Sequence, residues 1–110
     1  MTQESTLQNK PSAGLLMVIA PPSLEEMLVD ALLQQTQISG FTSSKVNGHG
    51  SEHAENGAQL SIVEQVTGRQ QRIQFMMHAS VEDLKNLTLA LKARFKNADI
   101  HYILLPVLDC

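Results

Sequence analysis

Potential metal ligands gather in a glycine-rich part of the chain that begins near residue 47. They are His49, Glu52, His53 and Glu55. Imidazole and carboxylate groups are suitable ligands for Zn(II), Cu(II) and Ni(II). The spacing of His49 and His53 would bring both onto one side of a helix, but the neighbouring glycines disfavour a helix here. We therefore interpret this cluster first as the polar surface of a loop, and second as a divalent metal site formed by His49 and His53.

Two glycines flank one of these histidines in the sequence Gly48-His49-Gly50. Glycine adopts positive φ angles readily, so this segment can form a turn whose backbone approaches a ligand. It can equally be a hinge at which a strand ends. Both interpretations stay open, and both predict that a long loop begins here.

Arg69 and Arg72 lie in a segment of alternating apolar and polar residues. A guanidinium group presents fixed donors that suit a phosphate or another anion. Exposed structural arginines on a strand are the alternative interpretation. Glu64 and Gln65 precede Arg69, and we interpret this group first as a structural or intersubunit contact and second as a contact to a partner protein.

Other side chains that can bind metals are scattered. We expect His78 and His101 to be half-exposed residues on separate strands, with a ligand role as the weaker alternative. Methionine thioethers can bind Cu(I), but two of the methionines fall at core-like positions and two point to opposite faces of one strand. A cysteine at the C-terminus is more often incidental. These residues are Met17 and Met27, Met76 and Met77, and Cys110.

The composition predicts one small globular domain in the cytoplasm. The chain has 110 residues, of which 43% are hydrophobic and 17% charged, and its net charge is −3. It lacks the basic face and the stacking aromatics that nucleic-acid binding needs. The longest apolar run, Ala13 to Pro22, is shorter than the ~20 residues of a membrane helix. No catalytic motif is present, so we expect no enzyme, no nucleic-acid partner and no membrane insertion.

Periodicity predicts the elements that would position these residues. A continuous apolar run predicts a strand at 15–20, and alternation predicts another at 69–79. Apolar residues three and four apart predict two helices, capped by Ser23 and Ser80, and Glu26 would complete a capping box in the first. The predicted buried stripes are Leu24, Met27, Leu28, Ala31 and Leu32, and then Leu84, Leu87, Leu91 and Phe95.

Two further strands are predicted at 38–46 and 100–108. The resulting order predicts an α+β fold, a ferredoxin-like βαββαβ sandwich with both helices on one face of the sheet. Residues 1–12 are expected to form a flexible arm and residues 13–110 a single domain. A long loop separates the second and third strands, and a loop of this length is typical of a functional element.

The segment from Gly40 to Gly50, GFTSSKVNGHG, resembles the Gly-x-Thr…Val-x-Gly-x-Gly signature of the PII signalling proteins. In those proteins the signature leads into the mobile T-loop, which corresponds to residues 47–69 here. The resemblance implies a homotrimer whose sheets face inward, with clefts between the subunits that hold adenine nucleotides. It also implies that the ligand changes the shape of the T-loop, which controls a transporter or an enzyme.

Other segments resemble an uncharacterised PII-like family that often occurs beside genes for heavy-metal efflux pumps of the RND type. They are His49 between its glycines, EQVTGR at 64–69, ADIHY at 98–102, and Pro106-Val107. The C-terminal strand is also similar to that of the trimeric CutA proteins.

Matching positions imply the roles of single residues. The ligand-contacting positions of PII proteins correspond to Thr42, Gly48, Gly50, Arg72 and Gln74, and His49 lies between the two glycines. Glu64, Gln65 and Arg69 would belong to the loop that contacts the partner.

The chain departs from the PII pattern after the second helix. PII proteins carry a Gly-Asp-Gly-Lys loop there, whereas residues 95–100 read FKNADI, and the tail 108–110 contains no arginine. A backbone cradle for phosphate favours glycine, which can turn tightly. A smaller or less charged nucleotide is therefore easier to accept than ATP bound in the PII manner.

Three functions follow as predictions. The first is a PII-like sensor that binds a small-molecule effector and controls a partner such as a membrane transporter. The alternative is a cytoplasmic metal buffer or metallochaperone that uses His49 and His53. The third is a structural oligomer whose loop serves assembly.

Overall fold

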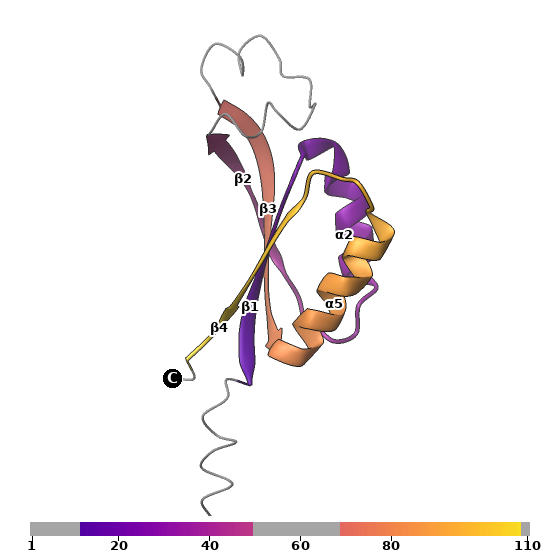
Figure 1. Cartoon of the computed structure of the whole chain (residues 1–110), viewed down its shortest axis with the longest axis vertical. Coiled ribbons are helices and arrows are strands. Elements are labelled where there is room, and N and C mark those ends of the chain that lie inside the picture. The colour runs from indigo at the N-terminus through magenta and orange to yellow at the C-terminus, as the bar shows by residue number, and fades with distance from the viewer. Residues whose placement is uncertain (1–11, 50–68, 109–110) are drawn as a thin grey trace, which may run out of the picture.

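The computed structural model describes residues 12–49 and 69–108 of the chain. The described strands form one antiparallel sheet in the order β2-β3-β1-β4. Two α-helices lie together on one face of this sheet (Figure 1). The elements are β1 (Ala13–Ala20), the 3-10 turn η1 (Pro22–Leu24), α2 (Glu25–Leu33), β2 (Thr42–His49), β3 (Arg69–Ser80), α5 (Val81–Arg94) and β4 (His101–Pro106). This is the predicted α+β, ferredoxin-like arrangement.

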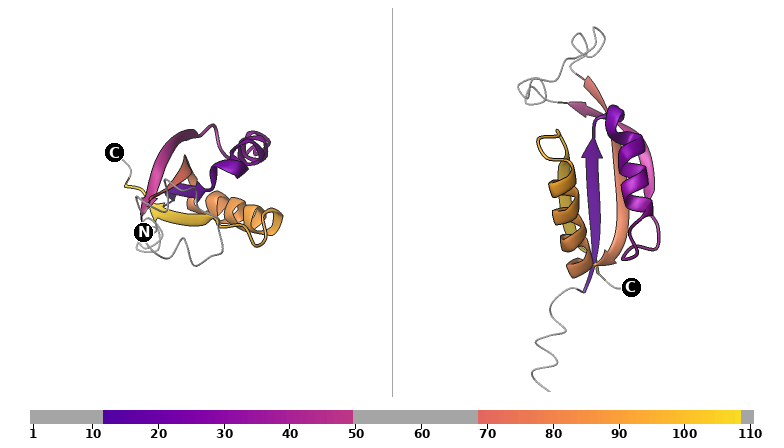
Figure 2. Two further views of the ribbon diagram at one scale, coloured as in Figure 1. Left: turned by 90° about the horizontal axis from the view of Figure 1, so that it is seen from above. Right: turned by 90° about the vertical axis from the view of Figure 1, so that its right-hand side faces the viewer.

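The hydrophobic core lies between the sheet and the helices (Figure 2). Strand β1 is central in the sheet, and every second residue along it is buried. Strand β3 and both helices supply most of the remaining large side chains. The fully buried core residues include Leu16 and Val18 of β1, Phe75 of β3, Leu28 and Leu32 of α2, and Leu84 and Leu87 of α5.

The opposite face of the sheet, which we call the open face, carries no covering layer in the described part of the chain. The strand register places Met17 between Met76 of β3 and Ile103 of β4 on this face. Leu105 lies beside Leu15 in the next row. Ile103 and Leu105 are 41% and 44% exposed. The sheet therefore has two apolar faces, and the helices cover one of them.

The first helix begins differently from the prediction. Ser23 lies inside the turn η1, and α2 begins after Leu24 without a side-chain hydrogen bond to its cap. The predicted capping box is therefore wrong, because the two prolines at 21 and 22 open a 3-10 turn before the helix starts. Met27, predicted to be buried, is 51% exposed, because only a narrow arc of this short helix faces the sheet.

Two strand predictions also need correction. Strand β2 begins at Thr42 rather than at residue 38, although Ile38 is still buried in the core. Met17 was expected in the core but is half-buried on the open face, since the alternation of β1 sends its even-numbered residues toward the helices. The proposed arm lies outside the described residues apart from Ser12, and so does the loop segment 50–68.

The second helix agrees closely with the prediction. The Ser80 side chain accepts a hydrogen bond of 3.0 Å from the backbone N–H of Asp83. Acidic residues occupy the first turn and basic residues the last, which suits the helix dipole. Among the described residues, no helix is long and apolar enough to cross a bilayer.

The two serines provide a matched test of this difference in capping. Replacing Ser80→Ala should lower the free energy of unfolding by about 1 kcal/mol, because an N-terminal N–H of α5 loses its acceptor. The same change at Ser23 should have little effect, since this side chain caps no helix. Thermal unfolding of both variants measures the difference, and equal losses would contradict the assigned helix starts.

Candidate functional site

The polar residues predicted to contact a ligand share the open face where β2 and β3 run side by side. In the antiparallel register Gln74 lies opposite Ser44, and Arg72 lies opposite Val46. Because side chains two residues apart on a strand point to the same face, this pairing aligns them in rows. The predicted residues on this face are Thr42, Gly48, Arg72 and Gln74.

The remaining predicted site residues belong to the loop. His49 pairs with Arg69 at the far end of the two strands. Other members of the predicted sites, namely Gly50, His53, Glu64 and Gln65, lie outside the described residues. The metal pair of His49 and His53 and the partner-contacting loop therefore stay predictions.

Arg72 forms the centre of a buried polar cluster. Its guanidinium is only 4% exposed, and its Nη2 donates to Oδ2 of Asp99 at 2.8 Å. The same nitrogen donates to Oε1 of Gln70, which is also buried. The other carboxylate oxygen of Asp99, Oδ1, lies 3.6 Å from Nε2 of His101. The cluster thus connects β3 with the start of β4 at one end of the sheet.

This burial overturns the interpretation of Arg72 as an exposed strand arginine. Removing a charge from water is costly unless it is paired and hydrogen-bonded, and both conditions are met here. The guanidinium is consequently held in one position. Sequence reasoning missed Asp99 and Gln70 as its partners. The sequence signal for Asp99 was its place in the segment ADIHY, which resembles the PII-like family. No periodicity relates residues 72 and 99, so the sequence did not predict that they pair.

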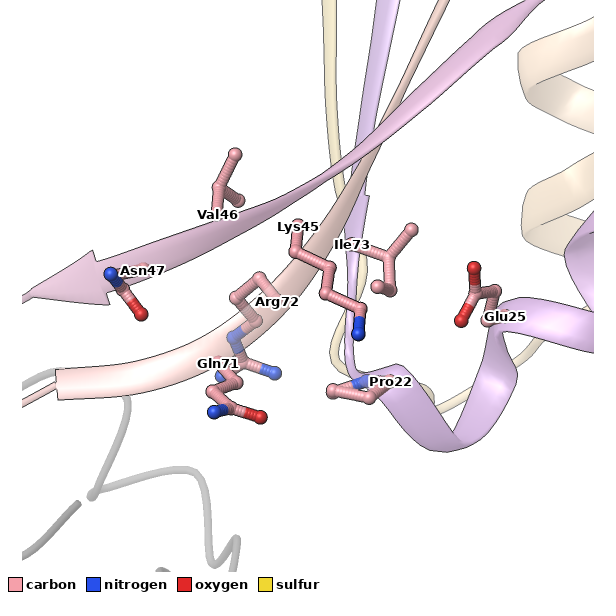
Figure 3. Close-up of a pocket in the computed structure, with 8 residues that line it drawn as sticks. All are labelled: Pro22, Glu25, Lys45, Val46, Asn47, Gln71, Arg72 and Ile73. Carbon is pink, nitrogen blue, oxygen red and sulfur yellow. The ribbon is translucent and has the colours of Figure 1, made fainter. Parts of the chain in front are cut away.

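A cleft of about 270 Å³ opens between the paired strands β2 and β3 and the beginning of α2 (Figure 3). Lys45 extends into it from β2, and Glu25 stands on the helix side. Arg72 and Gln71 border it from β3. The space is therefore surrounded by one ammonium group, one carboxylate, two side-chain amides and a guanidinium that is already paired with Asp99. It suits a small ligand with an anionic group and a hydrogen-bond donor.

The turn after α5 lies near the C-terminal end of β1, as the cleft does. It is tight although it contains no glycine. Asn97 has a φ of 65°, a left-handed conformation that asparagine tolerates better than most residues. The backbone N–H of Ala98 donates to the carbonyl of Phe95 at 3.2 Å. Beside this turn is a hollow of about 340 Å³ bordered by Lys96 and His101. Asn97 thus takes a conformation that we expected to require glycine.

The scattered histidines do not form a metal site with cysteine or carboxylate groups in the described residues. His78 and His101 lie on strands that flank β1 from opposite sides, next to Leu15 and Ile19 respectively. Within residues 12–49 and 69–108 no group of three histidine, cysteine or carboxylate side chains could hold a metal ion.

The prediction for Met76 and Met77 can be compared with the fold. Met76 lies on the open face and Met77 in the core, so the two point to opposite faces of β3 as predicted. Cys110 lies outside the described residues.

The buried ion pair can be tested by removing the charge of Asp99. The change Asp99→Asn should lower the free energy of unfolding by about 2 kcal/mol, because the buried Arg72 guanidinium loses this counter-charge. The control His101→Gln should cost less than about 1 kcal/mol, since its side chain is half-exposed. Denaturant unfolding measures both, and an unchanged stability of Asp99→Asn would contradict the pairing.

Solved structures with the same fold are available for comparison. A DUF3240 family protein from Shewanella baltica superposes with a TM-score of 0.70 at 20% identity, covering 92% of this chain and 96% of that one. CutA from Synechococcus elongatus, complexed with Bis-Tris, gives 0.64 at 14% identity, covering 89% and 82%. CPII from Thiomonas intermedia, a nitrogen regulatory PII-like protein bound to ADP, AMP and bicarbonate, gives 0.61 at 15% identity, covering 86% and 91%.

These likenesses establish a common fold with PII-like and CutA proteins. Comparison with curated proteins gives no match. The family comparison is more specific, because residues 11–110 match the family described as "protein of unknown function (DUF3240)". The chain therefore belongs to the DUF3240 family.

Proposed function

We propose that the protein is a cytoplasmic, PII-like sensor without enzymatic activity. It binds a small effector in clefts between the subunits of a homotrimer. The segment 47–69, which includes the loop between β2 and β3, passes the bound state on to a partner protein. The observation that carries this proposal is the open face, which is apolar in the middle and carries the polar residues Thr42, Arg72 and Gln74 where β2 and β3 run side by side.

The open face supports assembly. Its central rows carry Leu15, Met17, Ile19, Met76, Ile103 and Leu105, none of which lies in the covered core. A contiguous apolar sheet face of this kind is typical of a protein interface. Packing of three open faces against one another buries these residues and accounts for their exposure in one subunit.

The cleft beside β2 supports a ligand with an anionic group. Lys45 supplies positive charge there, and the Arg72 cluster, whose guanidinium is paired with Asp99, fixes one wall. CPII, which shares the fold, was solved with ADP, AMP and bicarbonate. The tight turn at Asn97, with Lys96 beside it, offers backbone groups and a charge to a short phosphate chain. We therefore favour ADP, AMP or bicarbonate over ATP as the effector.

The partner we favour is a membrane transporter of the heavy-metal efflux type. This rests on the resemblance to a family found beside such pumps. The mechanism follows from population shift. A ligand changes the conformation of the loop only if it binds the protein with different affinities in the two states of the loop. Strands β2 and β3 lead directly into the loop, so a cleft ligand touching Asn47 or Gln71 acts on residues next to its two ends.

Assembly through the open face predicts a selective mutational effect. The change Ile103→Glu should convert the assembled protein to monomers, because it places a charge in the proposed interface. The matched control Met27→Glu alters a comparably exposed residue on α2 and should leave assembly intact. Sedimentation analysis measures the mass of each variant. A wild-type monomer, or an assembly that tolerates Ile103→Glu, would overturn the trimer.

Ligand binding can be measured by thermal shift with ADP, AMP, ATP, bicarbonate, Zn(II), Cu(II) and Ni(II). A ligand at a hundred times its dissociation constant should stabilise the protein by about 2.7 kcal/mol, which is several degrees for a small domain. Lys45→Ala should weaken the shift, whereas Lys85→Ala, which lies outside the cleft, should not.

The same panel distinguishes the alternative functions. A metal shift that disappears in the variant His49→Ala/His53→Ala would favour the metal buffer over the sensor. The absence of any shift from nucleotides and bicarbonate would contradict the proposed effectors.

A further inference from the structure

Two methionines lie side by side at the centre of the open face. Met17 of β1 is directly opposite Met76 of β3 in the antiparallel register. Residues paired in this way have Cβ atoms about 5 Å apart, and their side chains leave the same face of the sheet. Strands β1 and β3 are the two inner strands, and Met17 lies near the middle of β1. The pair therefore occupies the middle of the open face both along and across the strands.

The sulfur atoms of this pair belong to the open face and not to the covered core. The core between the sheet and the helices includes Met77, whereas Met17 and Met76 lie outside it and are half-buried. The Sδ atom of Met76 accepts a hydrogen bond of 3.5 Å from Nε2 of Gln74, which is also on the open face. Methionine is unbranched and flexible, so both sulfurs can turn toward a shared ligand above the sheet.

The donor atoms in this part of the face are soft. From β2 to β4 the central row reads Thr42, Met76, Met17 and Ile103. This row includes no carboxylate, imidazole or thiolate, and His78 and His101 lie in the rows on either side of it. Thioether sulfur suits Cu(I), whereas imidazole suits divalent ions such as Zn(II) and Ni(II). The central row therefore favours Cu(I).

One subunit supplies a pair of thioethers, and the proposed trimer brings three such pairs together. When three sheets pack their open faces around one axis, the middle of each sheet lies nearest the axis, as the middle of each side of a triangle lies nearest its centre. Threefold symmetry then repeats Met17 and Met76 around a common point. Cu(I) has a filled d shell and, like Zn(II), imposes no geometry of its own, so it accepts a trigonal set of equivalent ligands.

The width of the sheet agrees with a site on the axis. The sheet has four strands, and at about 4.8 Å between neighbouring strands it is about 19 Å wide. The centre of a triangle with sides of that length lies about 5.5 Å from each side. A methionine extended away from the sheet carries its sulfur over most of this distance, and a metal–sulfur bond of about 2.3 Å covers the remainder.

We propose that the methionine pairs of three subunits form a thioether site that binds one Cu(I) ion on the axis of the trimer. Met17 supplies one sulfur from each subunit, and Met76 stands beside it as a second. Leu15, Ile19 and Ile103 surround the pair and exclude water, so oxygen ligands do not compete. This site requires the trimer proposed above, but neither its effector nor its loop.

Packing alone is the other role that methionines on an apolar face can have. Leucine has nearly the same volume as methionine but no sulfur, and an exchange of this kind usually costs little stability in a packed interior. The changes Met17→Leu and Met76→Leu therefore keep a packing role and remove a ligand role. Met27→Leu makes the same chemical change on α2, at an exposed position outside the open face.

The probe is Cu(I) itself, added under nitrogen with ascorbate and in competition with the chelator bicinchoninate. Every variant carries Cys110→Ser as well, because a thiolate would also bind Cu(I). We expect one Cu(I) ion per three chains. Met17→Leu should weaken binding by at least about tenfold, since even the loss of an outer-shell partner typically costs that much. Met76→Leu should weaken binding less, and Met27→Leu should leave it unchanged.

Carbon-13 labelling of the methionine methyl groups reports on each sulfur separately. Cu(I) should shift the Met17 and Met76 methyl signals, because it binds the adjacent sulfur atoms, whereas Zn(II) should move neither. The signal of Met77 should stay in place, since this neighbour of Met76 points into the core, and so should that of Met27. Unmoved signals of Met17 and Met76, or an unchanged Cu(I) affinity of Met17→Leu, would overturn the site.

Sedimentation of the same samples separates the failure of this site from the failure of the trimer. A trimer that does not bind Cu(I) overturns the site and leaves the assembly standing, whereas a monomeric parent protein overturns both. The monomers expected from Ile103→Glu keep both methionines but lose those of their neighbours, so they should bind Cu(I) at least about tenfold more weakly. Equal binding by these monomers would contradict a site on the axis.

Discussion

The central constraint on this structure is that β1 has two apolar faces, whereas the helices of the described residues cover only one of them. The strand alternates Leu16, Val18 and Ala20 toward α2 and α5 with Leu15, Met17 and Ile19 toward the other side. Neighbouring strands continue both patterns because paired residues share a face. One hydrophobic core is therefore completed within the chain, and a second apolar surface is left uncovered by the described residues. The proposed oligomer follows directly from this imbalance.

The buried ion pair gives the polar end of the sheet a fixed geometry. Arg72 and Asp99 are held together at 2.8 Å although 27 residues separate them in sequence. A buried charge pair contributes little net stability compared with apolar packing, but breaking it is costly. It therefore acts mainly to position β3 relative to the start of β4. That end of the sheet is also where the cleft and the turn at Asn97 lie.

The two edges of the sheet have different chemistry. Strand β2 is polar and leads into the loop, whereas β4 is apolar on both faces and borders a groove with two lysines. The proposed sensor uses the first edge and its cleft.

The sequence alone determined the order of elements, the core stripe of α5 and the cap at Ser80, because these depend on local periodicity and short-range hydrogen bonds. The family signature also brought Thr42, Arg72 and Gln74 together, and the structure places them on one face. Local patterns could not identify Met27 as exposed or Met17 as part of the open face, because an apolar residue fits either side of a sheet whose faces are both apolar.

Only the tertiary structure decided the burial of Arg72, its pairing with Asp99 and Gln70, and the groove beside β4. These features arise where segments distant in sequence meet, so no spacing within one segment encodes them. The strand order β2-β3-β1-β4 puts YILL at an edge, although its composition is typical of a central strand. Whether an apolar strand is enclosed or available to another chain depends on its neighbours in the sheet, and those are set by long-range pairing.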